Sequence, residues 1–534
     1  MSDEPVGVLI IGAGASGAAF AWSIAETGMS VLCLEQGPWV KQSEYPGNGM
    51  DWESRAPTEW SPNPNIRRRP TDYPVNDEAS AISPLMFNGV GGSTILWTAH
   101  FPRFTPNDFR VRSLDGVADD WPISYYDLEP YYATNDRMMG VSGLAGDPAY
   151  PYHEPPLPML PFGKLGETLA GGFEKLGWHW WPSDAAIISR EYEGRAACIN
   201  LGTCGSGCAQ GAKASTDITY WPVAQRRGVR IRTGCRVKEI TLGPDGLADG
   251  VLYYDETGTL REQKAEIVVV ACNGVGTSRL LLNSKSERFP DGLANSSGQV
   301  GKNLMFHPAA FVTGVFDEEF HGRRGPVSAT LWSHQFYHTN RSQGFLRGFS
   351  FEAVRGFGPA QTAMLGMAYG RVPWGPGHHK AYAKLFGHTA TLVCLTDDLP
   401  EEHNRVTLDP VLKDSNGIPA PRVSYTLGEN TKKILGFAAE RGDEVMRAAG
   451  AHDVMIDPQM RNAGWHLMGT ARMGRDPKTS VVNEWGRAHD VKNLFVIDGS
   501  VFVTGAAVNP TSTIQALALY IAANVKKNLA NLFD

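Results

Sequence analysis

The chain has 534 residues, of which 42% are hydrophobic and 20% charged, and its net charge at pH 7 is −7. This length exceeds one ordinary hydrophobic core, so we expect two or more closely joined domains. The acidic balance argues against a nucleic-acid partner, which would need a basic protein surface. No apolar stretch reaches the roughly 18 residues of a membrane span. The first residues are few and polar before the first apolar run, so we expect no signal peptide. We expect a cytoplasmic protein, with export alongside a partner subunit as the alternative.

The first element is a dinucleotide-binding unit. Residues 8–17 read VLIIGAGASG, a predicted strand and glycine turn, followed by a helix over 15–27 that Gly28 ends. A helix N-terminus favours phosphate through its free N–H groups and dipole. Glu35, at the end of the second apolar run, is placed to accept hydrogen bonds from ribose hydroxyls. We therefore expect a pyrophosphate against Gly12, Gly14, Ala15, Ser16 and Gly17.

The rest of the chain predicts an interrupted α/β fold. Residues 38–84 are predicted to be extended loop, and 229–254 alternate like a hairpin. A buried parallel strand is expected at 267–271 and a helix at 277–284. The α/β pattern returns at the end, with a strand over 494–498 and a helix over 511–532.

The predicted fold class is therefore α/β, a discontinuous Rossmann-like domain with an inserted, mostly β domain. Alternating aromatic and β-branched positions between about 308 and 455 indicate the inserted domain. We assign the nucleotide-binding domain to 1–150, 210–307 and 456–534. The inserted domain and its cap loops take 151–209 and 308–455.

Several separated segments resemble the glucose–methanol–choline (GMC) family of FAD-dependent alcohol oxidoreductases. They are the 12–35 unit, NGVGGSTILW at 88–97, VACNGVGTSRLLLN at 270–283, VGKNLMFH at 300–307, and WHLMGT at 465–470 with NPTST at 509–513. Within the family, the region around 97–123 is similar to the bacterial sugar and polyol dehydrogenase and pyranose oxidase branch. Some members attach the flavin covalently through a histidine where this chain has Leu96. The resemblance therefore implies FAD bound without that link.

The resemblance also implies the site residues. His466 matches the active-site histidine that takes the substrate proton, a role suited to an imidazole. Asn509 matches a second active-site position, occupied by His or Asn. The same segment is typical of a helix start with Asn509 as N-cap and Pro510 at the first helical position, and both interpretations stay open. We interpret His307 as a packing or helix-end residue. Further flavin contacts implied by the family are Gly91, Gly92, Ser93, Trp97, Val237, Ala271, Asp498, Gly499, Pro510 and Thr511.

Three cysteines, Cys198, Cys204 and Cys208, lie at short spacing in a glycine-rich loop. Three thiolates can hold an iron–sulfur cluster, and the spacing resembles a cluster segment in some bacterial relatives. Ala209 stands where proline often follows such motifs. We leave the cluster open but do not favour it, and predict no other metal site.

We therefore expect oxidation of an alcohol group to a carbonyl, with a sugar, glycoside or polyol as the preferred substrate. The electron acceptor would be a quinone, a redox protein or oxygen, and we favour a dehydrogenase. The first alternative is an aryl or long-chain alcohol oxidase of the same family. The second is a catalytically idle flavoprotein that serves as an electron-transfer subunit.

Overall fold

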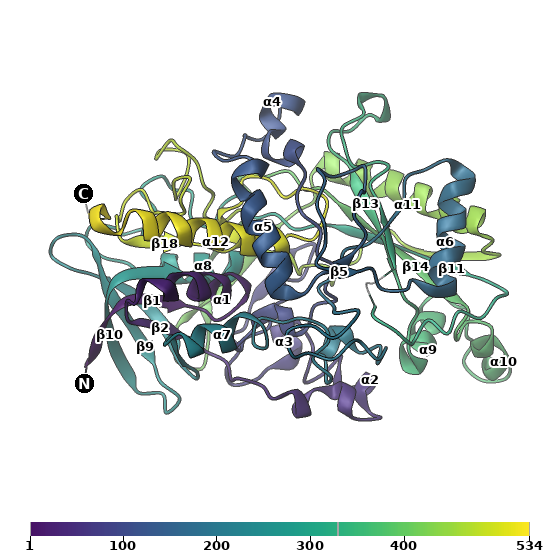
Figure 1. Cartoon of the computed structure of the whole chain (residues 1–534), viewed down its shortest axis with the longest axis horizontal. Coiled ribbons are helices and arrows are strands. Elements are labelled where there is room, and N and C mark those ends of the chain that lie inside the picture. The colour runs from purple at the N-terminus through teal and green to yellow at the C-terminus, as the bar shows by residue number, and fades with distance from the viewer. Residues whose placement is uncertain (1, 328–329, 533–534) are drawn as a thin grey trace.

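A seven-stranded sheet forms one end of the molecule in the computed structural model, which describes residues 2–327 and 330–532 (Figure 1). Its path is β7-β2-β1-β10-β9-β8, with β18 also paired to β10. The pairs β1–β2, β2–β7, β1–β10 and β10–β18 are parallel. The strands are β1 Ser2–Ile11, β2 Val31–Leu34, β7 Arg230–Arg232, β8 Arg236–Leu242, β9 Ala248–Tyr254, β10 Leu260–Val270 and β18 Leu494–Val496.

This sheet confirms the predicted α/β fold, because its parallel strands come from three separated parts of the chain. The helix α1 (Ala15–Ile24) ends in a 3₁₀ turn, and Gly28 stops it with φ +73°. The predicted hairpin is β8–β9. Residues 230–232 instead form β7, because they extend the parallel sheet beside β2. The helices around this sheet are α5 Tyr125–Met139, α7 Tyr220–Arg226, α8 Asn273–Asn283 and α12 Thr511–Lys527.

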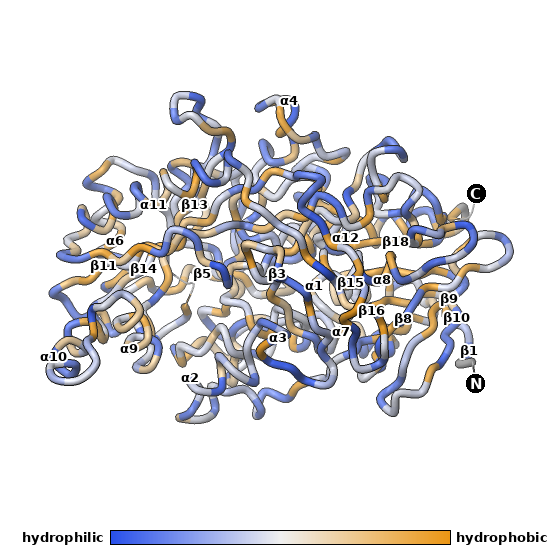
Figure 2. The backbone as a smooth tube through the Cα atoms, turned by 180° about the vertical axis from the view of Figure 1, so that it is seen from behind, coloured by the Kyte–Doolittle hydropathy of each residue, from blue (hydrophilic) through white to orange (hydrophobic). Residues whose placement is uncertain are grey.

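A second, six-stranded sheet occupies the opposite end, away from both termini (Figure 1). Its order is β17-β11-β14-β13-β12-β6, and its pairings are antiparallel. Hydrophobic residues follow β11 and β14 in Figure 2, as expected for a buried sheet. The strands are β6 Trp181–Pro182, β11 Ala309–Val315, β12 Leu331–Ser333, β13 Phe349–Val354, β14 Thr389–Thr396 and β17 Asp453–Asp457.

The helices of this region were not predicted from the sequence. The longest, α11 (Glu429–Ala449), packs on β11 and β14 and also contacts α6 (Gly163–Leu176). Gly442 obscured the helical pattern, yet it permits close packing: a Cβ there would lie 2.7 Å from a Val312 methyl carbon. The remaining helices are α2 Trp52–Arg55, α3 Pro64–Arg67, α4 Val111–Asp115, α9 Pro359–Ala368 and α10 His378–Ala383.

A three-stranded sheet joins segments that the sequence analysis assigned to different domains. It consists of β3 (Asn76–Ser80), β16 (Pro419–Tyr425) and β15 (Arg405–Lys413), and α8 packs against β15 and β16. Residues 405–425 thus lie against the nucleotide-binding fold. The expected boundary at 456 falls inside β17. A further small sheet pairs β4 (Ser142–Gly143) with β5 (Leu157–Pro158). Within the described ranges, no helix combines the length and apolar character that crossing a membrane requires.

Candidate cofactor and active site

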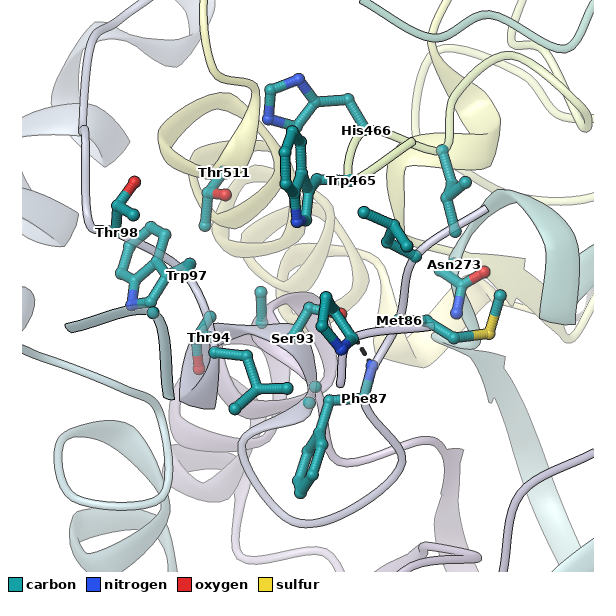
Figure 3. A pocket seen from close by; sticks show the side chains of 18 of the residues that line it. Met86, Phe87, Ser93, Thr94, Trp97, Thr98, Asn273, Trp465, His466 and Thr511 are labelled. Carbon is teal, nitrogen blue, oxygen red and sulfur yellow. Dashed lines mark hydrogen bonds between the residues drawn. The ribbon is translucent and has the colours of Figure 1, made fainter. Parts of the chain in front are cut away.

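A cavity of about 740 Å³ lies where the two large sheets meet. Its walls include the glycine turn after β1, the start of α12, and side chains from β11, β13 and β14. Figure 3 shows Trp465 and His466 on one wall, facing Ser93, Thr94 and Trp97. Segments distant in the sequence therefore share one chamber.

Two glycine turns interlock at one end of the cavity. Gly12 has φ +104°, and a Cβ there would lie 2.5 Å from the Ala271 carbonyl oxygen. A Cβ on Gly92 would lie 2.8 Å from the Gly14 Cα, while the Gly91 N–H donates to the Ala13 carbonyl oxygen at 2.9 Å. Side chains would push these turns apart, so glycines keep backbone N–H groups accessible to a ligand.

The start of α1 is suited to an anion. Gly14 is its N-cap and supplies no side-chain cap, which leaves the first-turn N–H groups and the helix dipole directed at the cavity. Glu35 lines the same cavity, and its carboxylate accepts from the Ala13 and Gly37 N–H groups at 2.9 and 2.8 Å. Burial raises the pKa of Glu35. This residue therefore fixes the turn as well as bordering the predicted ribose position.

A further part of the cavity wall is built around Asp498. Its carboxylate accepts from the Thr277 hydroxyl at 2.6 Å, the Asn273 N–H at 3.1 Å and the Ser500 N–H at 2.8 Å. These bonds tie the end of β18 to the start of α8. The helix α12 begins nearby at Thr511 without a side-chain cap, so its N-terminus also faces the cavity.

Most of the predicted cofactor contacts line the cavity. Gly17 and Gly91 do not, because both pack behind the wall: a Cβ on Gly17 would collide with the Gly12 carbonyl oxygen. Leu96 also lines the cavity. The cofactor-contact predictions that line it are Gly12, Gly14, Ala15, Ser16, Glu35, Gly92, Ser93, Trp97, Val237, Ala271, Asp498, Gly499, Pro510 and Thr511.

His466 lines the cavity, and a second histidine, His307, is paired with it from behind. The Nδ1 atoms of His307 and His466 are 2.7 Å apart, and His307 Nε2 is 2.9 Å from the Gly505 carbonyl oxygen. A carbonyl only accepts, so His307 Nε2 carries its proton and its Nδ1 is a bare acceptor. His466 must then donate from Nδ1, which leaves its Nε2 without a proton. His307 is buried as a packing residue would be, but it is more than that, because both of its ring nitrogens are hydrogen-bonded.

Both histidines are held neutral. Burial lowers the pKa of His307 to about 4. Burial also lowers the pKa of His466 well below its ordinary value, and His307 and His100 add to the effect. Neutral His466 with a bare Nε2 can act as a general base.

Asn509 lies beside a buried carboxyl group that the sequence analysis missed. The Asn509 side chain hydrogen-bonds Glu352 on β13, and burial raises the pKa of Glu352 to about 8. The Asn509 Oδ1 is buried without a partner. Pro510, not Asn509, is the N-cap residue of α12, and no side chain makes a capping hydrogen bond to this helix. The N-cap interpretation was therefore wrong, because the amide is turned to Glu352.

Lys213 is a second missed residue, and it supports the Gly91–Trp97 loop from behind. Its side chain is 1% exposed, and Nζ donates to the carbonyl oxygens of Ile95 and Trp97, both at 2.8 Å. Burial lowers the pKa of Lys213 to about 8. The Lys ammonium group carries three donors and satisfies several carbonyl oxygens at once. The sequence around a single lysine does not show this role.

The cysteine loop does not form a ligand set. Among the described residues, no three His, Cys, Asp or Glu side chains converge as a metal site. Burial raises the pKa of Cys198, and that of Cys204 to about 11. Metal binding needs thiolates, so an iron–sulfur cluster is not favoured.

Comparisons with known proteins agree with this architecture. Family models described as GMC oxidoreductase match residues 163–309 and 400–518, and one described as an NAD(P)-binding Rossmann-like domain matches 10–69. A 2-methyl-1,2-propanediol dehydrogenase from Mycolicibacterium austroafricanum is 44% identical over 100% of this chain and 97% of its own. The fructose dehydrogenase large subunit from Gluconobacter japonicus is 31% identical over 99% of both chains.

Solved structures show the same fold. Pyridoxine 4-oxidase from Mesorbium loti matches with a TM-score of 0.67 and 16% identity, over 97% of this chain and 98% of that one. A formate oxidase matches with a TM-score of 0.64 and 16% identity, over 100% of both chains.

Proposed function

The chain belongs to the GMC oxidoreductase family, FAD-dependent enzymes that oxidise alcohols to carbonyl compounds, and on that premise we propose that it oxidises a sugar, glycoside or other polyol. Two relatives that match nearly full length are named for a diol and for a sugar, which supports this substrate class. The observation that carries the mechanism is the His307–His466 pair with its bare Nε2.

The residues present fit FAD. The interlocked glycine turns would receive the pyrophosphate, Glu35 would border the ribose, and the α12 N-terminus would face negative charge on the reduced ring. Leu96 offers no nucleophile for a covalent link, so we expect non-covalent binding. When bound, FAD supplies the acceptor for a hydride.

Alcohol oxidation removes a hydride from the carbinol carbon and a proton from the hydroxyl oxygen. We assign the proton to His466 Nε2, since that nitrogen has no hydrogen and the ring is neutral. His307 holds the ring through Nδ1 and prevents the opposite tautomer. Asn509 orients the substrate oxygen. An idle electron-transfer subunit would not need this tautomer, so that alternative is not favoured.

The test measures the reduction of the flavin by polyols under anaerobic conditions. We expect bleaching of the flavin absorbance by wild type, and a rate about 10²–10⁴-fold lower in His466→Ala with FAD retained. His489→Ala is a control, because that histidine hydrogen-bonds Ser480 and does not line the cavity. A His466→Ala rate within threefold of wild type would remove this residue from the mechanism. Aryl or long-chain alcohols reducing the flavin faster than every polyol would favour the alternative oxidase.

Two further measurements define the cofactor and the acceptor. Denaturation should release free, unmodified FAD, and flavin that remains with precipitated protein would contradict the role given to Leu96. As a dehydrogenase, the enzyme should turn over faster with a quinone or dye than with oxygen. Peroxide production that matches the rate of flavin reduction would make it an oxidase.

A further inference from the structure

Three neutral polar groups, one on β13 of the second sheet and two in loops, gather on the wall of the cavity. Glu352 is 5% exposed on β13, and its Oε2 lies 3.5 Å from His100 Nε2. His100 is 2% exposed, and Asn509 joins the group through its bond to Glu352. All three residues line the cavity that also contains His466. We call Glu352, His100 and Asn509 the polar wall.

The hydrogen-bonding capacity of the polar wall is largely unused. Neither ring nitrogen of His100 has a hydrogen-bond partner, and neither has the Asn509 Oδ1. Buried polar atoms in folded proteins almost always have partners, from the protein or from water. An apolar substrate would leave these atoms unsatisfied, whereas a hydroxyl can donate and accept at the same time.

The protonation states match an uncharged ligand. Burial raises the pKa of Glu352 to about 8, so its carboxyl is protonated at neutral pH and can donate. Burial lowers the pKa of His100 to about 3, so its ring is neutral, with one donor and one acceptor nitrogen. The wall thus presents donors and acceptors without net charge, which disfavours an ammonium group as the ligand.

We propose that Glu352 and His100 bind a second hydroxyl of the substrate, adjacent to the one that is oxidised, and make the enzyme selective for vicinal diols and polyols over simple alcohols. This inference rests on the proposed function and deepens it. The polar wall and His466 line one chamber, and His100 lies close enough to His466 to contribute to its lowered pKa, so one small molecule can contact both. The selectivity follows because an analogue without the second hydroxyl leaves buried polar groups unpaired.

Binding can be measured without turnover. Pinacol is a vicinal diol whose two carbinol carbons carry no hydrogen, so it cannot lose a hydride. Its counterpart lacking one hydroxyl, 2,3-dimethylbutan-2-ol, has the same carbon skeleton. We expect FAD-loaded wild type to bind pinacol at least about tenfold more tightly than the mono-alcohol in calorimetry.

Variants assign that difference to the polar wall. Glu352→Leu should bring the affinity ratio of the two ligands close to one, whereas Glu352→Gln should retain most of it, because an amide also donates and accepts. Glu440→Leu, at an exposed site on α11, is a matched control that should keep the wild-type ratio. Thermal unfolding and the FAD content show whether each variant is folded and loaded.

Opposite outcomes overturn the proposal. Equal affinity of wild type for the two ligands would do so, as would a ratio that survives in folded Glu352→Leu. Tighter binding of an amino-alcohol cation than of pinacol would show that the wall recognises charge. Failure of alcohol oxidation itself would appear as absent flavin reduction and leave this binding result unaffected, so the two proposals fail separately.

Discussion

His307 determines which nitrogen of His466 carries the hydrogen. The Gly505 carbonyl holds a proton on His307 Nε2, and this fixes the direction of the hydrogen bond to His466. One backbone oxygen thereby sets the tautomer of the base, because each neutral imidazole has one donor and one acceptor. His307 is thus a positioning residue, and it touches the substrate only through His466.

Replacing His307 should slow proton transfer while sparing FAD binding. In His307→Ala the His466 ring loses its acceptor and the preference for a bare Nε2, so we expect flavin reduction to fall by roughly 10–100-fold. His307→Gln should recover part of the rate, because its amide oxygen can accept the His466 N–H. Rapid-mixing spectroscopy of FAD-loaded variants measures both rates. Glutamine and alanine variants with equal rates would refute the tautomer argument.

The pH dependence should reflect the depressed pKa of His466. The base works when neutral, so activity is present above the folded-state pKa and is lost as pH falls through it. Burial first, and then His307 and His100, lower this pKa, so kcat/KM should stay flat down through about pH 6.5, the ordinary value for histidine. In His307→Gln the acid limb should move upward. A wild-type limb at about pH 6.5 would contradict the burial argument.

At the scale of elements, the site depends on loops that approach each other at glycines. Gly92 has φ +53°, and a Cβ there would meet the Gly14 Cα at 2.8 Å. Gly92→Ala should therefore both destabilise the protein and weaken FAD binding. Gly116→Ala is the matched control, because Gly116 has φ +79° but nothing within 4 Å of an added Cβ.

Both glycine variants carry the backbone cost of a left-handed conformation, about 1–2 kcal/mol. Only Gly92→Ala should also raise the Kd for FAD, measured by titrating flavin into apoprotein. An unchanged Kd in folded Gly92→Ala would mean that the two turns do not need to touch.

The glycine elements were also the most predictable part of the chain. The strand, turn and helix over 8–28, the β8–β9 hairpin and the strands at β10 and β18 follow from local patterns. Tertiary packing determined the rest: β3 pairs with β16 from a segment more than 300 residues away, a contact invisible to local periodicity. The pattern of helix α11 was obscured by Gly442, which packs closely against Val312 on β11.

The candidate site was predictable only where a motif surrounded the residue. His466 and Asn509 lie in recognisable segments, and both line the cavity. Glu352 and His100 lie on a strand and in a loop with no motif of their own. Glu352 is a buried carboxyl group, and both ring nitrogens of His100 are buried without a hydrogen-bond partner; a sequence displays neither feature.

At the scale of the whole molecule, a buried arginine joins the second sheet to residues 108–115 near the start of the chain. Arg347, 2% exposed and just before β13, pairs with Asp397 at 2.7 Å and Asp115 at 3.4 Å, and also with Asp108. The Asp108 backbone carbonyl accepts from the Thr504 hydroxyl at 2.9 Å, next to the Gly505 that orients His307. The ion pairs of Arg347 are therefore linked, through Asp108, to Thr504, the neighbour of Gly505, whose carbonyl oxygen fixes the tautomer of His307.

Removing this arginine should destabilise the whole molecule, because buried carboxylates would lose their partner. Losing one member of a buried ion pair costs about 3–5 kcal/mol, so we expect Arg347→Met to lower the free energy of unfolding by that order, measured by denaturant titration. Arg371→Met is the control: Arg371 pairs with Asp453 at the surface, with 43% and 34% of the two side chains exposed. Such exposed pairs contribute about 0–1 kcal/mol. An equal loss in the free energy of unfolding in the two variants would show that the Arg347 ion pairs contribute no more than a surface pair. An unchanged rate of flavin reduction in Arg347→Met would show that these ion pairs do not influence His307 or His466.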